Sequence, residues 1–330
     1  MKDNLNKKIL FISPEFFGID KIIMHVLEEK GASVSWLNER SVTSAFCRAL
    51  NAVNPYFFYY QSNRYYRKSI EKLNETFDIV FVIKGDMVTK ETISFFKRKN
   101  PNAKIILYLY DPVRYIKGIL PKISLYDKVI SFEPDDCEKY GFEFRPLFCD
   151  FKKDSNKKNA VQKKYNICFY GTMYGDRFDI VQQAKVFCEK NNIKFYSFCF
   201  LRGKFMALYY WIKSKAFRKL GVDAISFTPK NSDEISDIIS SSDIILDTND
   251  VYQGGLTLRT LETLVSGKKM ITTNSNIEKY DFYNPKNIYV IDRKKIFIPQ
   301  DFLKTEYEPV DPAILERYTA EGWVHDVFIK

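Results

Sequence analysis

The stretch QGGLTLRTLETLVSGKKMITTN, residues Gln253–Asn274, contains a turn, a helix and a strand in close succession. Its two adjacent glycines are typical of a turn, and the apolar spacing that follows predicts a helix over residues 256–266. Short apolar runs predict strands before the turn, at 243–247, and after the helix, at 269–273. Strands that alternate with helices in this way are typical of a parallel α/β sheet.

The same alternation extends over most of the 330 residues. In the first half, the sequence predicts strands at 8–13, 33–37, 77–83, 104–110, 128–132 and 144–148, and helices at 21–30 and 89–99. A polar segment without periodicity follows at 151–164 and is interpreted as a linker. In the second half, the sequence predicts strands at 165–170, 194–200, 225–227, 243–247, 269–273 and 287–291, and helices at 177–190, 232–241 and 256–266.

We therefore predict an α/β protein with two Rossmann-like domains. The N-terminal domain covers residues 1–150 and the C-terminal domain residues 165–310. The tail, 311–330, is expected to be helical and to pack back on the N-terminal domain. Ligands of open parallel sheets bind beyond the carboxyl ends of the strands, so we expect the site in a cleft between the two domains.

The formal net charge of +10 favours an anionic partner, such as a nucleic acid, an anionic membrane surface or a phosphorylated substrate. A lysine-rich solvated surface would give the same charge. The six cysteines form no CxxC pair and are expected to be reduced core residues, and two histidines are too few for a His-based zinc site. Neither a secretory signal nor an apolar run of about 18 residues is found. We expect a cytoplasmic protein that can associate with the inner face of the cytoplasmic membrane.

Two stretches interrupt the α/β pattern and are rich in aromatic and basic residues. They cover residues 55–68 (PYFFYYQSNRYYRK) and 202–219 (RGKFMALYYWIKSKAFRK). Both resemble interfacial helices that lie on an anionic bilayer. The alternative is that they pack on the body of the protein and carry only a basic rim.

The chemistry of the stretch at 253–274 suits a phosphorylated ligand. Gly254 and Gly255 let a ligand approach the backbone, and the start of the helix offers free N–H groups and a positive dipole end. Thr257 adds a hydroxyl and Arg259 a fixed charge. A carboxylate one turn further, at Glu262, can reach two hydroxyls of a ribose. The alternative is a packing unit with an Arg259–Glu262 pair, in which the buried stripe is Leu258, Leu261 and Val265.

At this point the chain resembles a known family. The pattern Gly255-Leu256-Thr257-x-Arg259-x-x-Glu262 is similar to the donor-binding segment of bacterial GT-B glycosyltransferases of lipopolysaccharide and capsule biosynthesis. Further stretches agree with the family in their order along the chain: Phe169-Tyr170-Gly171-Thr172 with Asp176-Arg177, residues 227–247, Tyr108-x-Tyr110-Asp111, Phe132-Glu133-Pro134-x-Asp136, and Gly267-Lys268-Lys269 with Ile271-Thr272-Thr273-Asn274.

The resemblance implies a nucleotide-sugar donor in the C-terminal domain and a glycan acceptor, expected to be lipid-linked, in the N-terminal domain. A UDP-sugar is favoured, and GDP-, CMP- and dTDP-sugars remain as alternatives. The diphosphate would lie on 255–257, the ribose on Glu262, and the base beside residues 227–230. The implied donor-binding residues are Gly171, Thr172, Arg177, Phe227, Lys230, Gln253, Gly255, Leu256, Thr257, Arg259 and Glu262.

One position departs from the family pattern. Many retaining GT-B enzymes carry a glutamate eight residues before the position of Glu262, where this chain has Gly254. This favours an inverting mechanism, which needs a general base and a positive site for the leaving diphosphate, with no metal and no cofactor. The base candidates at the carboxyl edge of the first sheet are Asp20, Asp111 and Glu15. Their alternative roles are a helix cap, a turn residue and a solvated loop residue, respectively.

Two other functions are compatible with parts of the sequence. A GT-B-type nucleotide-sugar epimerase or hydrolase keeps the fold, but such sites depend on histidine, of which the chain has only two. A non-enzymatic protein that binds membranes or nucleic acid would explain the charge and the aromatic residues. The sequence contains no zinc-finger, helix-turn-helix or RNP motif, so no nucleic-acid partner is expected.

Overall fold

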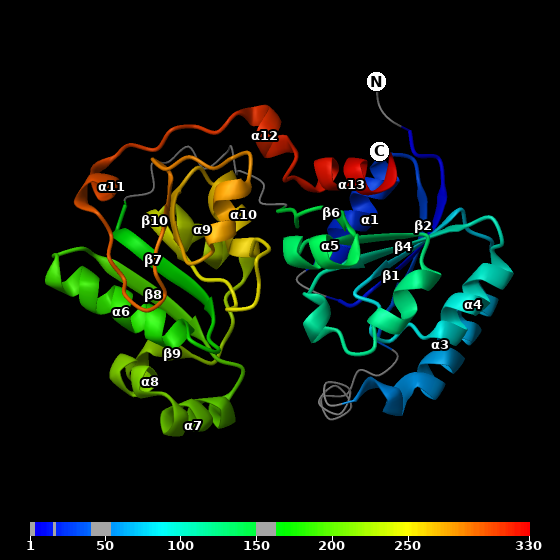
Figure 1. Ribbon diagram of the computed structural model, residues 1–330, viewed down its shortest axis with the longest axis horizontal. Coiled ribbons are helices and arrows are strands. Elements are labelled where there is room, and N and C mark those ends of the chain that lie inside the picture. The colour runs from blue at the N-terminus through cyan, green and yellow to red at the C-terminus, as the bar shows by residue number, and fades with distance from the viewer. Residues whose placement is uncertain (1–3, 16–17, 41–53, 150–162) are drawn as a thin grey trace. The chain divides into compact units, whose positions relative to one another are not determined.

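A computed structural model of the chain describes residues 4–15, 18–40, 54–149 and 163–330. The chain forms two compact units (Figure 1). Unit 1 comprises Met1–Asp150 and Arg317–Lys330, and unit 2 comprises Phe151–Glu316. Most of the predicted linker lies outside the described residues. Each unit contains one six-stranded sheet, and all the strand pairs within these two sheets are parallel.

The sheet of unit 1 has the strand order β2-β1-β3-β4-β5-β6. From β1 the chain turns to β2 on one side, and from β3 onward it builds the other side. The topological switch point, where ligands of such sheets bind, therefore lies between β1 and β3. The strands are β1 Lys8–Ser13, β2 Ser33–Asn38, β3 Ile79–Ile83, β4 Lys104–Leu109, β5 Lys128–Ser131 and β6 Glu143–Phe144.

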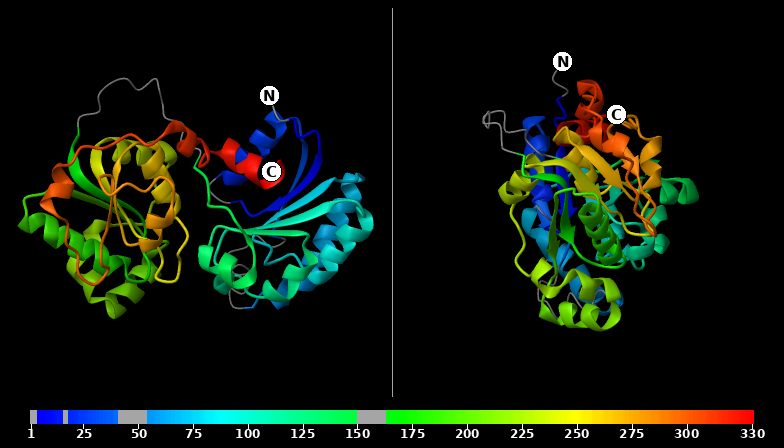
Figure 2. Two further views of the ribbon diagram at one scale, coloured as in Figure 1. Left: turned by 45° about the horizontal axis from the view of Figure 1, so that its top comes forward. Right: turned by 90° about the vertical axis from the view of Figure 1, so that its left-hand side faces the viewer.

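Helices cover both faces of this sheet. Helices α3 (Tyr59–Leu73) and α4 (Lys90–Lys99) bury apolar side chains against one face. On the other face, α13 (Ala320–Phe328) lies beside α1 (Ile19–Glu29), as Figure 2 shows. The C-terminal helix therefore belongs to the core of unit 1. The remaining helical segments are α5 Pro134–Tyr140, η1 Pro55–Phe58, η2 Val113–Tyr115 and η3 Leu120–Leu125.

The predicted strand at 144–148 is wrong beyond its first residue, because β6 covers only Glu143–Phe144. The apolar run after β6 is buried by the C-terminal segment instead of by a strand. The Phe148 ring packs against Trp323 of α13, with ring centroids 5.2 Å apart, and the Cys149 N–H donates to the Tyr318 carbonyl. A short apolar run thus indicates burial without telling which element provides it.

The sheet of unit 2 has the strand order β12-β11-β10-β7-β8-β9. The chain builds one side from β7 to β9 and the other from β10 to β12, so the switch point lies between β7 and β10. The strands are β7 Tyr165–Thr172, β8 Phe195–Phe200, β9 Ile225–Ser226, β10 Ser242–Asp247, β11 Lys269–Thr272 and β12 Ile288–Val290.

Helices α6 (Arg177–Lys190) and α8 (Lys215–Leu220) pack on one face of this sheet, and α9 (Ser232–Ser240) packs on the other (Figure 1). The other helical segments of unit 2 are α7 Lys204–Lys213, α10 Leu258–Val265, α11 Gln300–Lys304, α12 Pro312–Glu316, η4 Val222–Ala224 and η5 Ser275–Lys279. Within the described part of the chain, no helix combines the length and the apolar character needed to cross a membrane.

The buried face of α10 differs from the predicted stripe. Leu261 is buried as expected, but Leu258 and Val265 are only half-buried. The helix buries polar side chains in their place: Arg259, Thr260 and Thr263. Since a hydrophobic pattern cannot mark polar residues as core, the rotation of this helix was not predictable from apolar spacing.

Candidate functional site

A fully buried carboxylate, Asp247, lies at the carboxyl end of β10, beside the switch point of unit 2. It accepts hydrogen bonds from the hydroxyl groups of Thr257 (2.8 Å), Thr260 (2.9 Å) and Thr272 (3.1 Å). It also forms an ion pair of 3.2 Å with Nη1 of Arg259. Four donors thus compensate the cost of burying this charge, and they join the end of β10 to the start of α10 and the end of β11.

The first turn of α10 is fixed by a capping box. The Thr257 hydroxyl accepts a hydrogen bond of 3.1 Å from the Thr260 N–H, and the Thr260 hydroxyl accepts one of 3.3 Å from the Thr257 N–H. Because Thr257 also donates to Asp247, its single hydroxyl hydrogen is used within the protein and is not available to a ligand. What the helix start offers a ligand is therefore backbone N–H groups at the positive end of the helix dipole.

The glycine turn before α10 is held by two side-chain amides. Asn274 Nδ2 donates to the carbonyls of Gly254 (3.0 Å) and Gly255 (3.2 Å). Gln253 Nε2 donates to the Gly255 carbonyl over 3.1 Å. With their carbonyls turned toward these amides, the two peptide groups are fixed in orientation. Gln253, predicted to bind the donor, thus supports the turn from within the chain.

Arg259 and Gly171, both predicted donor-binding residues, are in contact. A Cβ atom at Gly171 would lie 2.1 Å from Nη2 of Arg259, so only glycine leaves room for this guanidinium. The guanidinium also lies over the rings of Phe169, at 4.8 Å, and Tyr170, at 5.1 Å. The end of β7 and the start of α10 are thereby joined across the switch point.

Glu262 points to the same strand end. Its Oε2 accepts a hydrogen bond of 2.6 Å from the Tyr170 hydroxyl, and no described residue donates to Oε1. Burial raises the pKa of Glu262, against the opposing effects of the Tyr170 hydrogen bond and the Arg259 charge. The alternative Arg259–Glu262 pair is wrong, since Arg259 pairs with Asp247 and Glu262 with Tyr170. One carboxylate oxygen therefore remains for a ligand hydroxyl.

Arg177, at the start of α6, provides a second buried guanidinium. It donates to the carbonyls of Thr172 (2.8 Å) and Thr248 (2.7 Å), which close β7 and follow β10. Burial and the nearby charge of Arg259 lower the pKa of Arg177 to about 10. Two guanidinium groups and the carboxylate of Asp247 therefore lie at one strand end, and these three groups carry one positive charge in excess.

Phe227 and Lys230, predicted beside the nucleotide base, lie apart from this cluster. They follow β9, and β7 and β8 separate β9 from β10 in the sheet, a distance of about 14 Å at the usual strand spacing. Lys230 pairs with Glu234 of α9 over 2.8 Å and lies 5.1 Å above the ring of Phe198. Phe227 is exposed.

Sequence reasoning missed the outer part of this site. Arg293 forms an ion pair of 2.7 Å with Asp176, 117 residues away in sequence. It also donates to the carbonyl and the side-chain oxygen of Asn249, whose Oδ1 accepts from Thr273 as well. Asp247 was predicted only as the last residue of the strand at 243–247. The sequence did contain a signal for Asp247. This acid ends an apolar strand and precedes a helix start that carries threonine and arginine.

The three base candidates all follow strands of unit 1. Asp20 is buried in the first turn of α1, whose cap residue is Gly18, so Asp20 is not the helix cap. Asp111 is half-exposed and pairs with Lys84 over 3.2 Å. Glu15 is exposed. Among the described residues, no three His, Cys, Asp or Glu side chains are grouped as metal ligands.

No family model matches the chain, and no curated protein matches its sequence. Solved structures do match its fold. An α-glucosyltransferase in complex with UDP and a 13-mer DNA is 14% identical, with a TM-score of 0.59 over 97% of this chain and 96% of that chain. The apo form of the lipopolysaccharide outer core galactosyltransferase WaaB is 15% identical, with a TM-score of 0.54 over 94% of this chain and 95% of that chain.

A third match is Anabaena HepE in complex with UDP and glucose, which is 12% identical with a TM-score of 0.52. The alignment covers 98% of this chain and 95% of HepE. The three matches extend over both units, each of which has its own parallel six-stranded sheet. The chain therefore has the GT-B fold of glycosyltransferases, as the resemblance of its motifs implied.

Proposed function

We propose that the protein is a glycosyltransferase that moves a sugar from a nucleotide-sugar donor to a glycan acceptor. One observation carries this proposal: two buried guanidinium groups, of Arg177 and Arg259, lie with a helix N-terminus at the switch point of unit 2. Positive charge and oriented N–H groups at the carboxyl ends of parallel strands suit a diphosphate.

Each part of the donor has a place in this proposal. The N–H groups of 255–257 and of the first turn of α10 receive the diphosphate, and Gly171, Thr172 and Arg177 approach it from β7. Glu262 binds the ribose through its unoccupied Oε1. Residues 227–230 flank the base at the edge of the sheet. UDP is favoured because two of the matching structures contain it, and GDP, CMP and dTDP are the alternatives.

A thermal-shift screen with UDP, GDP, CMP and dTDP tests the donor site. A nucleotide at a hundredfold excess over its Kd stabilises the folded protein by about 2.7 kcal/mol. We expect one nucleotide to raise the Tm of the wild type and to raise that of Glu262→Ala much less. Glu278→Ala is the matched control, because Glu278 also accepts a tyrosine hydroxyl, from Tyr283, but lies on η5. Absence of any response in the wild type would contradict the proposal.

The proposed transfer inverts the anomeric carbon and needs no metal. The glycine at position 254, where many retaining enzymes carry glutamate, supports inversion. The general base belongs to the carboxyl edge of unit 1, where Asp20, Asp111 and Glu15 lie. NMR of the product made from an α-linked nucleotide-sugar checks the stereochemistry, because inversion gives a β-glycoside. Activity that persists in excess chelator checks the independence from metal.

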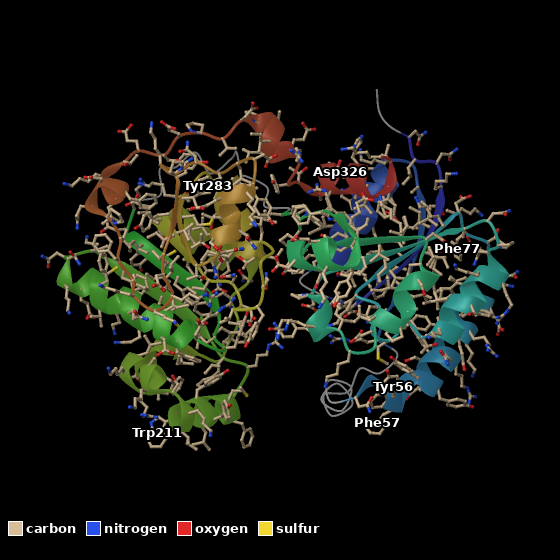
Figure 3. All side chains as sticks on the ribbon, in the orientation of Figure 1. Tyr56, Phe57, Phe77, Trp211, Tyr283 and Asp326 are labelled. Atoms are coloured by element: carbon tan, nitrogen blue, oxygen red, sulfur yellow. The ribbon has the colours of Figure 1, made fainter. Side chains whose placement is uncertain are left out.

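The acceptor in this proposal is a lipid-linked glycan of bacterial surface polysaccharide synthesis, reached at the inner face of the cytoplasmic membrane. Helix α7 supports membrane contact, since only Ala207 among its ten residues is buried. Trp211 points outward from it (Figure 3). The exposed apolar side chains are Phe205, Met206, Leu208, Tyr209, Trp211 and Ile212, and the basic side chains near them are Arg202, Lys204, Lys213 and Lys215.

The stretch at 55–68 contributes less than the sequence suggested. Tyr66 is fully buried in unit 1, and α3 packs against the sheet and α4. Three rings at its start remain exposed, those of Tyr56, Phe57 and Tyr60, and Figure 3 shows the first two at the surface. The first part of the stretch therefore supports membrane contact and the second part belongs to the core.

Sedimentation with lipid vesicles tests the membrane proposal. We expect the wild type to sediment with vesicles that contain phosphatidylserine but not with neutral phosphatidylcholine vesicles, because the apolar rings insert beside a basic rim. Phe205→Ser with Trp211→Ser should abolish binding, while Phe297→Ser, which removes an exposed ring elsewhere on unit 2, should not. Retention on DNA rather than on vesicles would favour the nucleic-acid alternative.

A further inference from the structure

Helices α3 and α4 of unit 1 carry most of the net charge of the chain. Their 25 residues include eight basic and two acidic side chains, so they hold six of the ten net positive charges. Of the 51 Lys and Arg and the 41 Asp and Glu in the chain, 43 and 39 lie elsewhere, which is nearly a balance. The basic residues of α3 are Arg64, Arg67, Lys68 and Lys72. Those of α4 are Lys90, Lys97, Arg98 and Lys99. These eight side chains are called the α3–α4 face below.

The charges of the α3–α4 face are not neutralised within the protein. All eight side chains are exposed, and seven of them form no ion pair with a described residue. The exception is Lys97, whose Nζ lies 3.5 Å from Oδ1 of Asp127. A surface that serves only solubility intersperses both signs of charge. Like charges four positions apart, such as Arg64 and Lys68, also destabilise a helix. An anionic partner would remove this repulsion.

The helix dipole explains only half of this charge. A cation in the last turn of a helix is favourable, and Lys72 and the three residues at 97–99 occupy last turns. The other three basic residues of α3 lie in the middle of that helix. Lys90 is the first residue of α4, where the dipole disfavours a cation. For these four residues, helix stability gives no reason for a positive charge.

The two helices form one continuous surface. They lie side by side on the same face of the sheet of unit 1 (Figure 1). Nδ2 of Asn63 donates to Glu91 over 2.6 Å, and the guanidinium of Arg67 lies 5.8 Å from the centroid of the Phe95 ring. The inner side of α3, with Tyr66, belongs to the core of unit 1. The outer sides of both helices therefore present their charges together.

Exposed aromatic rings continue this surface at the start of α3. Tyr60 lies one helical turn before Arg64 and is 80% exposed. Tyr56 and Phe57 of η1 precede it, and Figure 3 shows both at the surface. Asn54 fixes η1 by accepting the Tyr56 N–H over 3.0 Å. Aromatic rings beside a basic surface are typical of proteins that lie on an anionic bilayer.

A bilayer fits this surface better than a nucleic acid does. The phosphates of lipids and those of nucleic acids would both satisfy the eight cations. A nucleic-acid duplex keeps its bases stacked inside, so it offers no partner to the exposed rings of Tyr56, Phe57 and Tyr60. A bilayer accepts such rings at its interface with water.

We propose that the α3–α4 face docks unit 1 on an anionic lipid bilayer. Lipid phosphates lie against its basic side chains, and the rings of Tyr56, Phe57 and Tyr60 enter the interface. This rests on the membrane contact in the proposed function and deepens it, because α7 belongs to unit 2 and exposes mainly apolar side chains. The stretch at 55–68 contains only three of the eight basic residues, since α4 follows β3. The sequence therefore indicated only part of this surface.

The first experiment removes charge from the face and measures sedimentation with vesicles of phosphatidylserine and phosphatidylcholine. The face variant combines Arg64→Gln, Lys68→Gln, Lys90→Gln and Arg98→Gln. Each cation near an anionic surface strengthens binding about fivefold, so we expect the partition constant to fall about 10²- to 10³-fold. The wild type should also lose binding as salt rises, because salt screens these charges.

A second variant has the same net charge and serves as the control. It combines four changes on four other elements: Lys21→Gln, Lys190→Gln, Lys279→Gln and Lys304→Gln. These lysines are exposed, and we expect a loss of less than about tenfold, since dispersed charges are screened beyond about 10 Å in 0.1 M salt. Both variants should keep the Tm of the wild type. Equal losses in the two variants, or full binding by the face variant, would overturn the proposal.

The second experiment distinguishes the bilayer from a nucleic acid. We expect Phe57→Ser with Tyr60→Ser to weaken vesicle binding, whereas Phe297→Ser, on unit 2, should not. Retention on a DNA duplex that is lost in the face variant, with vesicle binding unchanged, would overturn the proposal. Wild type that sediments with no vesicle would overturn it together with the membrane contact of α7. The donor site would stand in that case, because the nucleotide screen tests it without lipid.

Discussion

Asp247 and Glu39 occupy the same kind of place and have opposite surroundings. Both are fully buried carboxyl groups at the carboxyl edge of a parallel sheet, near a switch point. Asp247 accepts from three hydroxyl groups and pairs with Arg259. Glu39 accepts one peptide N–H, and its Oε2 has no donor among the described residues. Equal burial thus goes with a different number of donors, four for Asp247 and one for Glu39.

The two units therefore differ in what their buried carboxyl groups hold in place. In unit 2, the buried acid holds Thr257 and Arg259 in place, so the backbone of the glycine turn and the first turn of α10 remain for the ligand. In unit 1, the buried carboxyl group of Glu39 keeps one oxygen without a donor among the described residues. The end of β10 in unit 2 is thus the more fully cross-linked of the two places.

The largest effect is expected from Asp247→Asn. This change removes the buried charge that pairs with Arg259, and an amide donor then faces three hydroxyl groups. Breaking a buried ion pair on one side costs about 3–5 kcal/mol, measurable by urea unfolding. The control is Asp243→Asn on the same strand, because Asp243 forms an ion pair with the exposed Lys163, and its cost should be about 0.5 kcal/mol or less. Equal losses in the two variants would show that Asp247 is not the organising group.

The fold was predictable from the sequence where burial follows apolar periodicity. The predicted strand at Lys8–Ser13 is confirmed, and the helix at Arg177–Lys190 begins and ends as predicted. The buried face of α10 was not predictable, since its Arg259 and Thr260 are core residues only because Asp247 lies beneath them. Hydrophobic patterns carry no information about such polar cores.

The candidate site was predictable in its residue types and only partly in its contacts. Gly171 and Arg259, which are 88 positions apart, were both chosen from the motif, and they touch. The packing alternative paired Arg259 with Glu262, whereas Arg259 pairs with Asp247 and Glu262 with Tyr170. Arg293 was missed entirely, because its partner Asp176 lies 117 positions away and local sequence patterns do not indicate such distant contacts.

A smaller effect is expected from Gly171→Ala, which tests how tightly unit 2 is built. The new Cβ would lie 2.1 Å from Nη2 of Arg259, so the guanidinium must move from its place over the aromatic rings. Overpacking of this kind costs about 1–3 kcal/mol, and we expect the Tm shift by the bound nucleotide to be lost as well. Gly175→Ala controls for backbone strain, because its φ is also positive but nothing lies within 4 Å of its Cβ. Normal nucleotide binding by Gly171→Ala would separate Arg259 from the donor site.

The most localised change is Tyr170→Phe, which removes only the hydroxyl that donates to Glu262. A hydrogen bond to an ionised group is worth about 1.5–3 kcal/mol, and the loss should be largest at high pH, where Glu262 is ionised. The pKa of Glu262 is already raised by burial, and losing the hydroxyl raises it further. The stability lost by the variant should therefore shrink as pH falls and Glu262 becomes protonated, which urea unfolding at several pH values measures. In Tyr283→Phe, which leaves the exposed Glu278 solvated, the loss should be small at every pH. If Tyr170→Phe behaves like this control, Glu262 gains its orientation from the backbone, and the contrast between the buried acids of the two units rests on Asp247 alone.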